Sequence, residues 1–334
     1  DFVMPRNGSR ISKSITYAIF LALFLLSGCA SLYPDGVPPE EPAPEPVAVE
    51  IDTTPIDPIT VTPLGRQPWN FELPGVAIVM TNSQPAYADV AVELAERLEN
   101  YEVYDLGGNS EPPINVLRRV NDSNSSVVVA IGLRAARSSV AMSKKPVIFS
   151  QVFNHQEHEL LTENSRGVAA IAPLDAQLAA WKKIDPTIVR IGVIIGEGHD
   201  ELIERAQVAA EKHGVELRVQ VTTSDQETLY FFRRMIRDID GFWLFPDNRI
   251  LSGRVLQEML SDANRQQVPV TVPTESMLEL GATLSISTVA ADIARTIVKV
   301  IREVQSGNFE ALPPITQLSE IRVLTSGAIQ VVGR

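Results

Sequence analysis

Beyond residue 74 the chain alternates between short apolar runs and longer segments with apolar residues at helical spacing. The runs GVAIVMT, SVVVAIG and VRIGVIIG have the length and continuous hydrophobicity of strands that are buried on both faces. Segments such as Ala86–Leu98 follow them, with apolar positions three or four residues apart. This alternation predicts an α/β fold with two doubly wound parallel-sheet lobes and a central cleft.

The order of the segments predicts where one lobe ends and the other begins. The stretch Gly167–Ala170 closes the first series of about five strands, and a helix from Pro173 to Ile184 leads into a second series of similar size. The expected parts are lobe 1, residues 74–172 and 289–312; lobe 2, residues 173–288; and a C-terminal strand segment, residues 313–334.

The first 28 residues have the organisation of a signal peptide (1–28). Arg6, Arg10 and Lys13 precede an uncharged run that is too short for the roughly 20 residues of a membrane span. Small residues then lead to Cys29, the only cysteine, in the sequence LSGCA, which resembles a bacterial lipobox. We expect cleavage before Cys29 and acylation of its thiol. A simple signal peptide with an incidental cysteine is the alternative.

Residues 29–73 differ from the rest of the chain because they are rich in proline and glutamate. Eleven of the 23 prolines lie between Pro34 and Pro74, and the stretch PDGVPPEEPAPEPVAVE has no apolar periodicity. Proline fixes φ and neighbouring acids repel one another, so this part is expected to be an extended tether. Ala30 after the cysteine favours the outer membrane over the inner membrane of a bacterial envelope, with the protein facing the periplasm.

The charge balance and the residue inventory exclude several functions. The 334 residues include 29 Lys and Arg against 41 Asp and Glu, a net charge of −12 that would repel nucleic acid. One cysteine excludes a disulfide framework and every multi-cysteine metal site. His155, His158 and Glu159 are the best metal candidates, but nothing elsewhere in the sequence completes their site. No nucleophile elbow or Walker lysine is present, so we expect no enzyme, cofactor or metal.

Three long stretches carry a resemblance to a known family. They are VVVAIGLRAARSSVAMSKKPVIFSQV, NSRGVAAIAPLDAQLAAWKKIDPTIVRIGVI and GFWLFPDNRILSGRVLQEMLSDANRQQVPVTVPTESMLELGATLSI. In order and spacing they resemble ABC transporter substrate-binding proteins of the uncharacterised or tryptophan-binding type, across about Gly75–Asn308. The resemblance implies a type I periplasmic-binding fold that holds a small solute between two lobes and delivers it to an ABC permease.

The residues that match ligand-facing positions of this family lie at the ends of strands. They are Asn82, Ser83, Gln84, Gly132, Gln151, Asn154, Asp247, Asn248 and Glu275. An amino acid needs a carboxylate for its ammonium group, which Asp247 or Glu275 would supply, and amide or hydroxyl donors for its own carboxylate. The alternative is that these polar residues are only helix caps and turn formers.

Two functions therefore remain open at the level of sequence. The first is a lipid-anchored solute-binding protein of the ABC-transporter type for a small polar solute such as an amino acid. The second is a non-transport envelope lipoprotein that reuses this fold as a scaffold or activator of a cell-envelope protein complex. The long tether favours the second function, as do Leu133 and Arg134, which occupy a turn where the family has a small hydroxyl residue.

Overall fold

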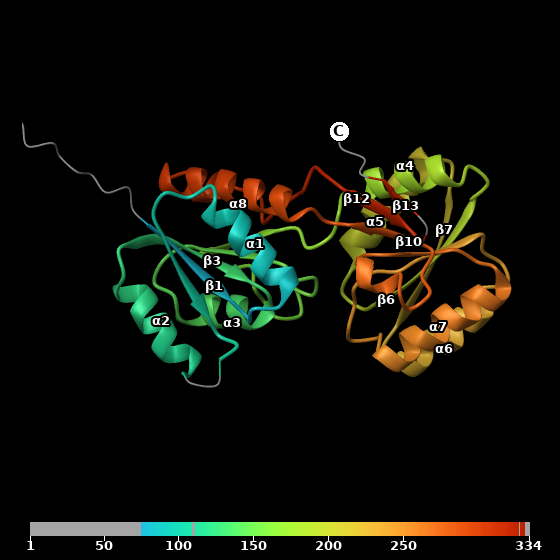
Figure 1. The fold of residues 1–334 in the computed structure, drawn as a ribbon, viewed down its shortest axis with the longest axis horizontal. Helices are drawn as coiled ribbons and strands as arrows, with labels where there is room; N and C mark the ends of the chain where they lie inside the picture. The colour runs from blue at the N-terminus through green and yellow to red at the C-terminus, as the bar shows by residue number, and fades with distance from the viewer. Residues whose placement is uncertain (1–74, 109–110, 327, 331–334) are drawn as a thin grey trace, which may run out of the picture. The chain divides into compact units, whose positions relative to one another are not determined.

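The computed structural model describes residues 75–108, 111–326 and 328–330, in which strands and helices alternate (Figure 1). The predicted signal peptide, the tether and Cys29 lie outside the described residues. The helices are α1 (Pro85–Ala95), α2 (Pro113–Asp122), α3 (Leu133–Met142), α4 (Leu174–Ile184), α5 (Asp200–Lys212), α6 (Asp225–Met235), α7 (Gly253–Gln266) and α8 (Ala290–Gln305).

The strands form two separate sheets. Sheet A has the order β11-β5-β4-β3-β1-β2, and sheet B has the order β13-β12-β10-β9-β8-β6-β7. Sheet A contains β1 (Gly75–Met80), β2 (Tyr101–Asp105), β3 (Ser125–Ile131), β4 (Val147–Ser150), β5 (Ser165–Val168) and β11 (Ile315–Thr316). Sheet B contains β6 (Arg190–Gly196), β7 (Glu216–Thr222), β8 (Gly241–Trp243), β9 (Val270–Val272), β10 (Leu284–Ser287), β12 (Arg322–Thr325) and β13 (Ala328–Gln330).

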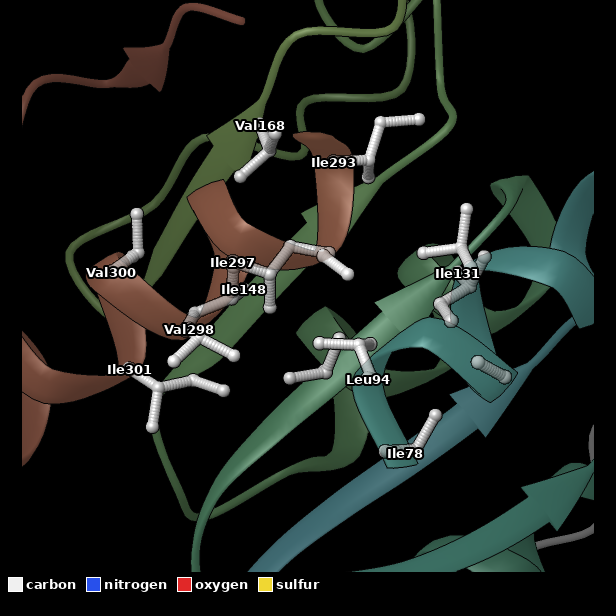
Figure 2. Packing of buried hydrophobic residues seen from close by; sticks show 14 of the residues in the cluster. Ile78, Leu94, Ile131, Ile148, Val168, Ile293, Ile297, Val298, Val300 and Ile301 are labelled. Atoms are coloured by element: carbon white, nitrogen blue, oxygen red, sulfur yellow. The ribbon is translucent and has the colours of Figure 1, made fainter. Parts of the chain in front are cut away.

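Sheet A is parallel throughout and is covered by helices on both faces. Because side chains alternate along a strand, Ile78 of β1 packs with α1 and α8, while its neighbour Val79 packs with α2 and α3. Figure 2 shows the first of these cores, in which Leu94 of α1 lies near Ile78 and Ile297 of α8 lies near Ile148. Strands buried on both faces explain the continuous apolar runs in the sequence.

Sheet B is built in the same way, except at one edge. In β6 the side chains again alternate, so that Val193 packs with α4 and α5, while Ile194 packs with α6 and α7. The strands β6 to β10 are parallel, but β12 and β13 are antiparallel additions. The predicted α/β class with two doubly wound, mainly parallel lobes is confirmed. The sheets have six and seven strands rather than about five each, because the short C-terminal strands extend both.

The C-terminal segment does not belong to one sheet alone. Its strand β11 pairs with β5 of sheet A, and β12 then joins sheet B. Gly167 of β5 allows the first pairing, since a Cβ atom there would come within 2.6 Å of the Phe149 ring and would also collide with Ile315. The chain therefore passes between the sheets after β5, after β10 and after β11.

A buried carboxylate joins two of these three passages. Asp292, in the first turn of α8, is 2% exposed. It accepts hydrogen bonds from the backbone N–H groups of Ser319 at 2.8 Å and Glu320 at 2.9 Å, both in the passage from β11 to β12. Burial alone would raise the pKa of Asp292, but the hydrogen bonds from Glu320 and Ser319 hold it below its usual value.

We predict that Asp292→Asn lowers the free energy of unfolding by about 1–3 kcal/mol at pH 7, because the amide replaces one acceptor oxygen with a donor. A depressed folded-state pKa means that the stabilisation is present above the unfolded value near 4 and is lost as the pH falls through the folded value. The stability difference between wild type and variant should therefore shrink below about pH 4.

Denaturant titrations at pH 7, 5 and 3 measure this difference. Asp89→Asn, at an exposed position of α1, is the matched control and should change stability by less than about 0.5 kcal/mol. A difference for Asp292→Asn that stays constant down to pH 3 would contradict the assignment.

Candidate functional site

A cavity of about 350 Å³ lies where the carboxyl ends of β4 and β5 meet the first turns of α5. In doubly wound folds this end of the strands is where ligands bind. Most of the wall is apolar and includes Val152, Phe153 and Ile171. The polar side chains that line it are His155, Gln156, His199, Glu201, Arg205 and Gln317. The size is within the range of small-molecule sites.

The charged groups of the cavity come from one face of α5. Glu201 and Arg205 are four residues apart, so their side chains leave the helix on the same side. The Arg205 Nη2 donates to Oε1 of Gln317 at 2.6 Å, which holds the guanidinium beside the segment that leaves β11. The wall thus offers an apolar surface together with one carboxylate and one guanidinium, which suits a solute with groups of both charges.

His155 adds a group that is neutral at pH 7. Burial lowers the pKa of His155 below its ordinary value, and this effect outweighs the hydrogen bond with the backbone of Phe153 that raises it. The ring lies 5.9 Å from the ring of Phe149, centroid to centroid. A neutral imidazole can both donate and accept a hydrogen bond, so it adds polarity to the cavity without charge.

A buried network borders the cavity and connects loops from both sheets. The Nδ2 of Asn154, after β4, donates to Oδ1 of Asp247, after β8, at 3.2 Å and to Oδ1 of Asn248 at 3.3 Å. The Oδ1 of Asn154 then accepts from Nε2 of His199 at 2.9 Å. Phe153 packs against the His199 ring at 4.7 Å between centroids. The network therefore positions two residues of the cavity wall.

The carboxylate of Asp247 is the centre of this network and is only 1% exposed. Arg249 donates to it through Nε at 2.9 Å and Nη2 at 2.8 Å, and the backbone N–H of Gly196 donates at 2.9 Å. Burial alone would raise the pKa of Asp247, but hydrogen bonds from Arg249 and His199 lower it well below its usual range. Asp247 is therefore ionised and fully engaged by protein groups.

The structure brings together three of the nine residues predicted from the sequence, namely Asn154, Asp247 and Asn248. The hydrogen bonds of this network involve neither Gln151 nor Glu275. Glu275 forms an ion pair with Arg322 of β12 at 3.0 Å. Gln151, directly after β4, has a left-handed backbone with φ 60°.

The predicted residues after β1 have local roles as turn and cap residues. The backbone N–H of Gln84, the N-cap residue of α1, donates to Oδ1 of Asn82 at 3.0 Å. The hydroxyl of Ser83 donates to Asp105 at the end of β2. Gly132 is the N-cap residue of α3 with φ 85°, and a Cβ atom there would come within 2.9 Å of the Tyr87 ring. None of the nine predicted residues lines the described cavity.

Sequence reasoning did not identify Phe153, His199 and Arg205 as site residues. His199 follows the end of β6 in the turn GEGH, so a polar residue after an apolar strand was an available signal. Arg205 lies inside a helix that reads as an ordinary amphipathic segment, and only its contact with Gln317 places it at the cavity. Leu133 and Arg134 line a different hollow, beside His158 on the α3 side of sheet A.

Within residues 75–108, 111–326 and 328–330, no group of three or more His, Cys, Asp and Glu side chains is placed to hold a metal ion. None of the helices in the described ranges has the length and apolarity needed to cross a bilayer.

Comparison with known proteins agrees with this architecture. The model of the family "ABC transporter substrate binding protein" matches residues 84–326, which is more than half of the chain. No curated protein matches the sequence.

Several solved structures have the same fold. An ABC domain in complex with L-Trp from Streptococcus pneumonia is 20% identical, with a TM-score of 0.51, 75% of this chain covered and 91% of that one. A conserved domain protein from Vibrio cholerae is also 20% identical, with a TM-score of 0.52 and the same coverage.

A substrate-binding protein with adhesive properties from Clostridium difficile, in a ligand-free, open structure, is 14% identical, with a TM-score of 0.56, 76% of this chain covered and 92% of that one. At these identities the likeness shows the fold, a type I periplasmic-binding fold. The family match adds the class: the chain is a binding protein and not an enzyme. It belongs to the family of ABC transporter substrate-binding proteins.

Proposed function

We propose that the chain binds a small polar solute, with an amino acid as the first candidate, and delivers it to an ABC permease. The observation that carries the proposal is the cavity at the carboxyl ends of β4 and β5, with Glu201 and Arg205 on one side of an otherwise mainly apolar wall. A carboxylate and a guanidinium on one wall complement the ammonium and carboxylate of a zwitterion. The apolar wall suits an uncharged side chain.

The strand-end residues identified from the sequence lie outside the lining of the cavity and remain proposed solute contacts. They are Asn82, Ser83, Gln84, Gly132, Gln151, Asn248 and Glu275. We assign Asn154 and Asp247 the role of positioning the cavity wall, because their polar atoms already bond to Arg249, His199 and each other.

We further propose that Cys29 carries lipid and anchors the protein in the bacterial envelope, in the outer membrane rather than the inner one, with the folded part facing the periplasm. The support is the lipobox-like sequence LSGCA and the small residue Ala30 after the cysteine.

A second candidate function has one observation in its favour. Both carboxylates predicted to receive a solute ammonium have protein partners, since Asp247 is paired with Arg249 and Glu275 with Arg322. Such internal pairing is expected of a fold reused as an envelope scaffold or activator that contacts a protein complex. Solute binding at Glu201 and Arg205 is what separates the two functions.

We predict that an amino acid from a panel of amino acids, nucleosides, sugars and short peptides raises the melting temperature of the purified chain in a dose-dependent way. At a solute concentration of 100 Kd the expected stabilisation is about 2.7 kcal/mol. Arg205→Ala and Glu201→Gln should each abolish the shift, because each removes one charge that faces the solute.

Glu204→Gln, an exposed position on the same helix outside the cavity wall, is the matched control and should keep the full shift. A flat response of well-folded protein across the panel would overturn solute binding and support the scaffold function.

We predict that Arg249→Ala lowers the free energy of unfolding by about 3 kcal/mol, because it leaves the Asp247 carboxylate buried without its cation. Chemical denaturation measures the loss. Arg254→Ala removes an exposed arginine, paired with Glu258 at 3.0 Å, and should cost less than about 1 kcal/mol. Equal costs for the two variants would mean that the pairing of Asp247 has no special weight.

We predict that the chain expressed in a Gram-negative host takes up an alkyne analogue of palmitate and enters the detergent phase on Triton X-114 partitioning. Cys29→Ser should lose the label and move to the aqueous phase, because it removes the acylated thiol. Label that persists in Cys29→Ser would refute acylation at this residue.

A further inference from the structure

A groove of about 870 Å³ runs between α6 and α7 of sheet B and is distinct from the cavity described above. Arginine is the commonest residue of its wall, which contains Arg233, Arg234, Arg237 and Arg254 against only two acids, Asp238 and Glu258. Arg233 and Arg234 lie in the last turn of α6, Arg237 follows the helix, and Arg254 comes from the first turn of α7.

Two of these arginines are held by carboxylates of α7. Arg233 donates to Asp262 at 2.8 Å and to Glu258 at 2.9 Å. Arg254 donates to the other oxygen of Glu258 at 3.0 Å. These pairs hold the guanidinium groups of Arg233 and Arg254 and compensate the charges of Glu258 and Asp262.

The other two arginines are directed at no carboxylate of the described chain. Arg234 stacks over the ring of Tyr230, at 5.6 Å from its centroid, and donates to the tyrosine hydroxyl at 3.1 Å. Arg237 is exposed and has neither a hydrogen bond nor an ion pair to any residue in the described ranges. Tyr230 is itself 56% exposed, so its ring and the guanidinium stacked on it both face solvent.

The net charge of this surface is opposite in sign to the net charge of the whole chain. The chain carries a net charge of −12, yet the lining of the groove has four arginines against two carboxylates, and a third carboxylate, Asp262, pairs with Arg233. Tyrosine and arginine are the residues most often found at the energetic centre of protein interfaces. Arginine is also the residue that best matches carboxylates, which it binds through two parallel hydrogen bonds.

We propose that the α6–α7 groove is a docking surface for a carboxylate-rich segment of a partner protein, whose acids pair with Arg234 and Arg237. Tyr230 positions Arg234 and contributes the apolar contact. The surface lies on helices that cover sheet B and shares no residue with the solute cavity, so it serves a function separate from solute binding. A variant of the groove can therefore lose docking and keep solute binding, and a variant of the cavity can do the reverse.

The test measures fluorescence anisotropy of a fluorescein-labelled octaglutamate peptide titrated with the full chain at 50 mM NaCl. Saturable binding is expected, with an affinity that falls at least fivefold at 300 mM NaCl because the contacts are ionic and exposed. The double variant Arg234→Glu, Arg237→Glu should bind at least tenfold more weakly. Tyr230→Ala should weaken binding about threefold, since Arg234 loses the ring that orients it.

The matched control is the double variant Arg118→Glu, Arg302→Glu, which makes the same change of net charge. Both residues are exposed and belong to α2 and α8, the helices that pack on sheet A. It should change the affinity less than threefold, and thermal melting should confirm that all the variants are folded. An equal loss in both double variants, or no saturable binding of the peptide to the wild type, would overturn the proposal. Binding of phosphatidylglycerol vesicles in place of the peptide, abolished by the groove variant, would also overturn it and assign the surface to lipid.

Discussion

The geometry of the site depends on one buried negative charge. A carboxylate that is 1% exposed, as Asp247 is, stays ionised only when cations and N–H donors surround it. Its donors come from Gly196 at the end of β6, Arg249 after β8 and Asn154 after β4, so strand ends of both sheets must meet at this point. Since Phe153 and His199 belong to the same loops, the wall of the cavity takes its form from the same requirement.

A second buried carboxylate, that of Asp292, plays a similar part in the passages between the sheets. Asp292 begins α8 and accepts N–H donors from the passage between β11 and β12. Asp292 fixes backbone that belongs to no helix or sheet, whereas Asp247 joins the last residue of β6 to side chains of the loops after β4 and β8. Apolar packing orders the helices over each sheet, whereas these two carboxylates order the irregular segments between them.

Local sequence patterns predicted most of the fold. The continuous apolar strands, such as β1 and β6, and the amphipathic helices between them could be read because strand and helix periods are properties of neighbouring residues. The strands β11 to β13 could not be assigned to their sheets in this way. They have only two to four residues, and β11 and β12 are placed by pairing with β5 and β10, which lie far away in the sequence, while β13 pairs with β12.

The site was predicted less completely for the same physical reason. Polar residues at strand ends were found, and three of them meet. The sequence does not say that Arg249 neutralises Asp247, because Asp247 reads equally well as a free acceptor. Nor does it say that Arg205, on the face of a helix, reaches Gln317 more than a hundred residues away. Long-range pairing decides which charges remain available, and periodicity contains no information about it.

The division of the C-terminal segment between the sheets affects the order in which the protein can fold during synthesis. Sheet A lacks its edge strand until residues 315–316 have been made, and sheet B lacks β12 until residues 322–325 have followed. Contacts between distant parts of a chain form slowly, and neither sheet can gain these edge strands until residues 315–325 have left the ribosome. Both sheets are therefore completed well after their central strands have been made, which keeps the nascent chain open for longer than its many local βα units would suggest.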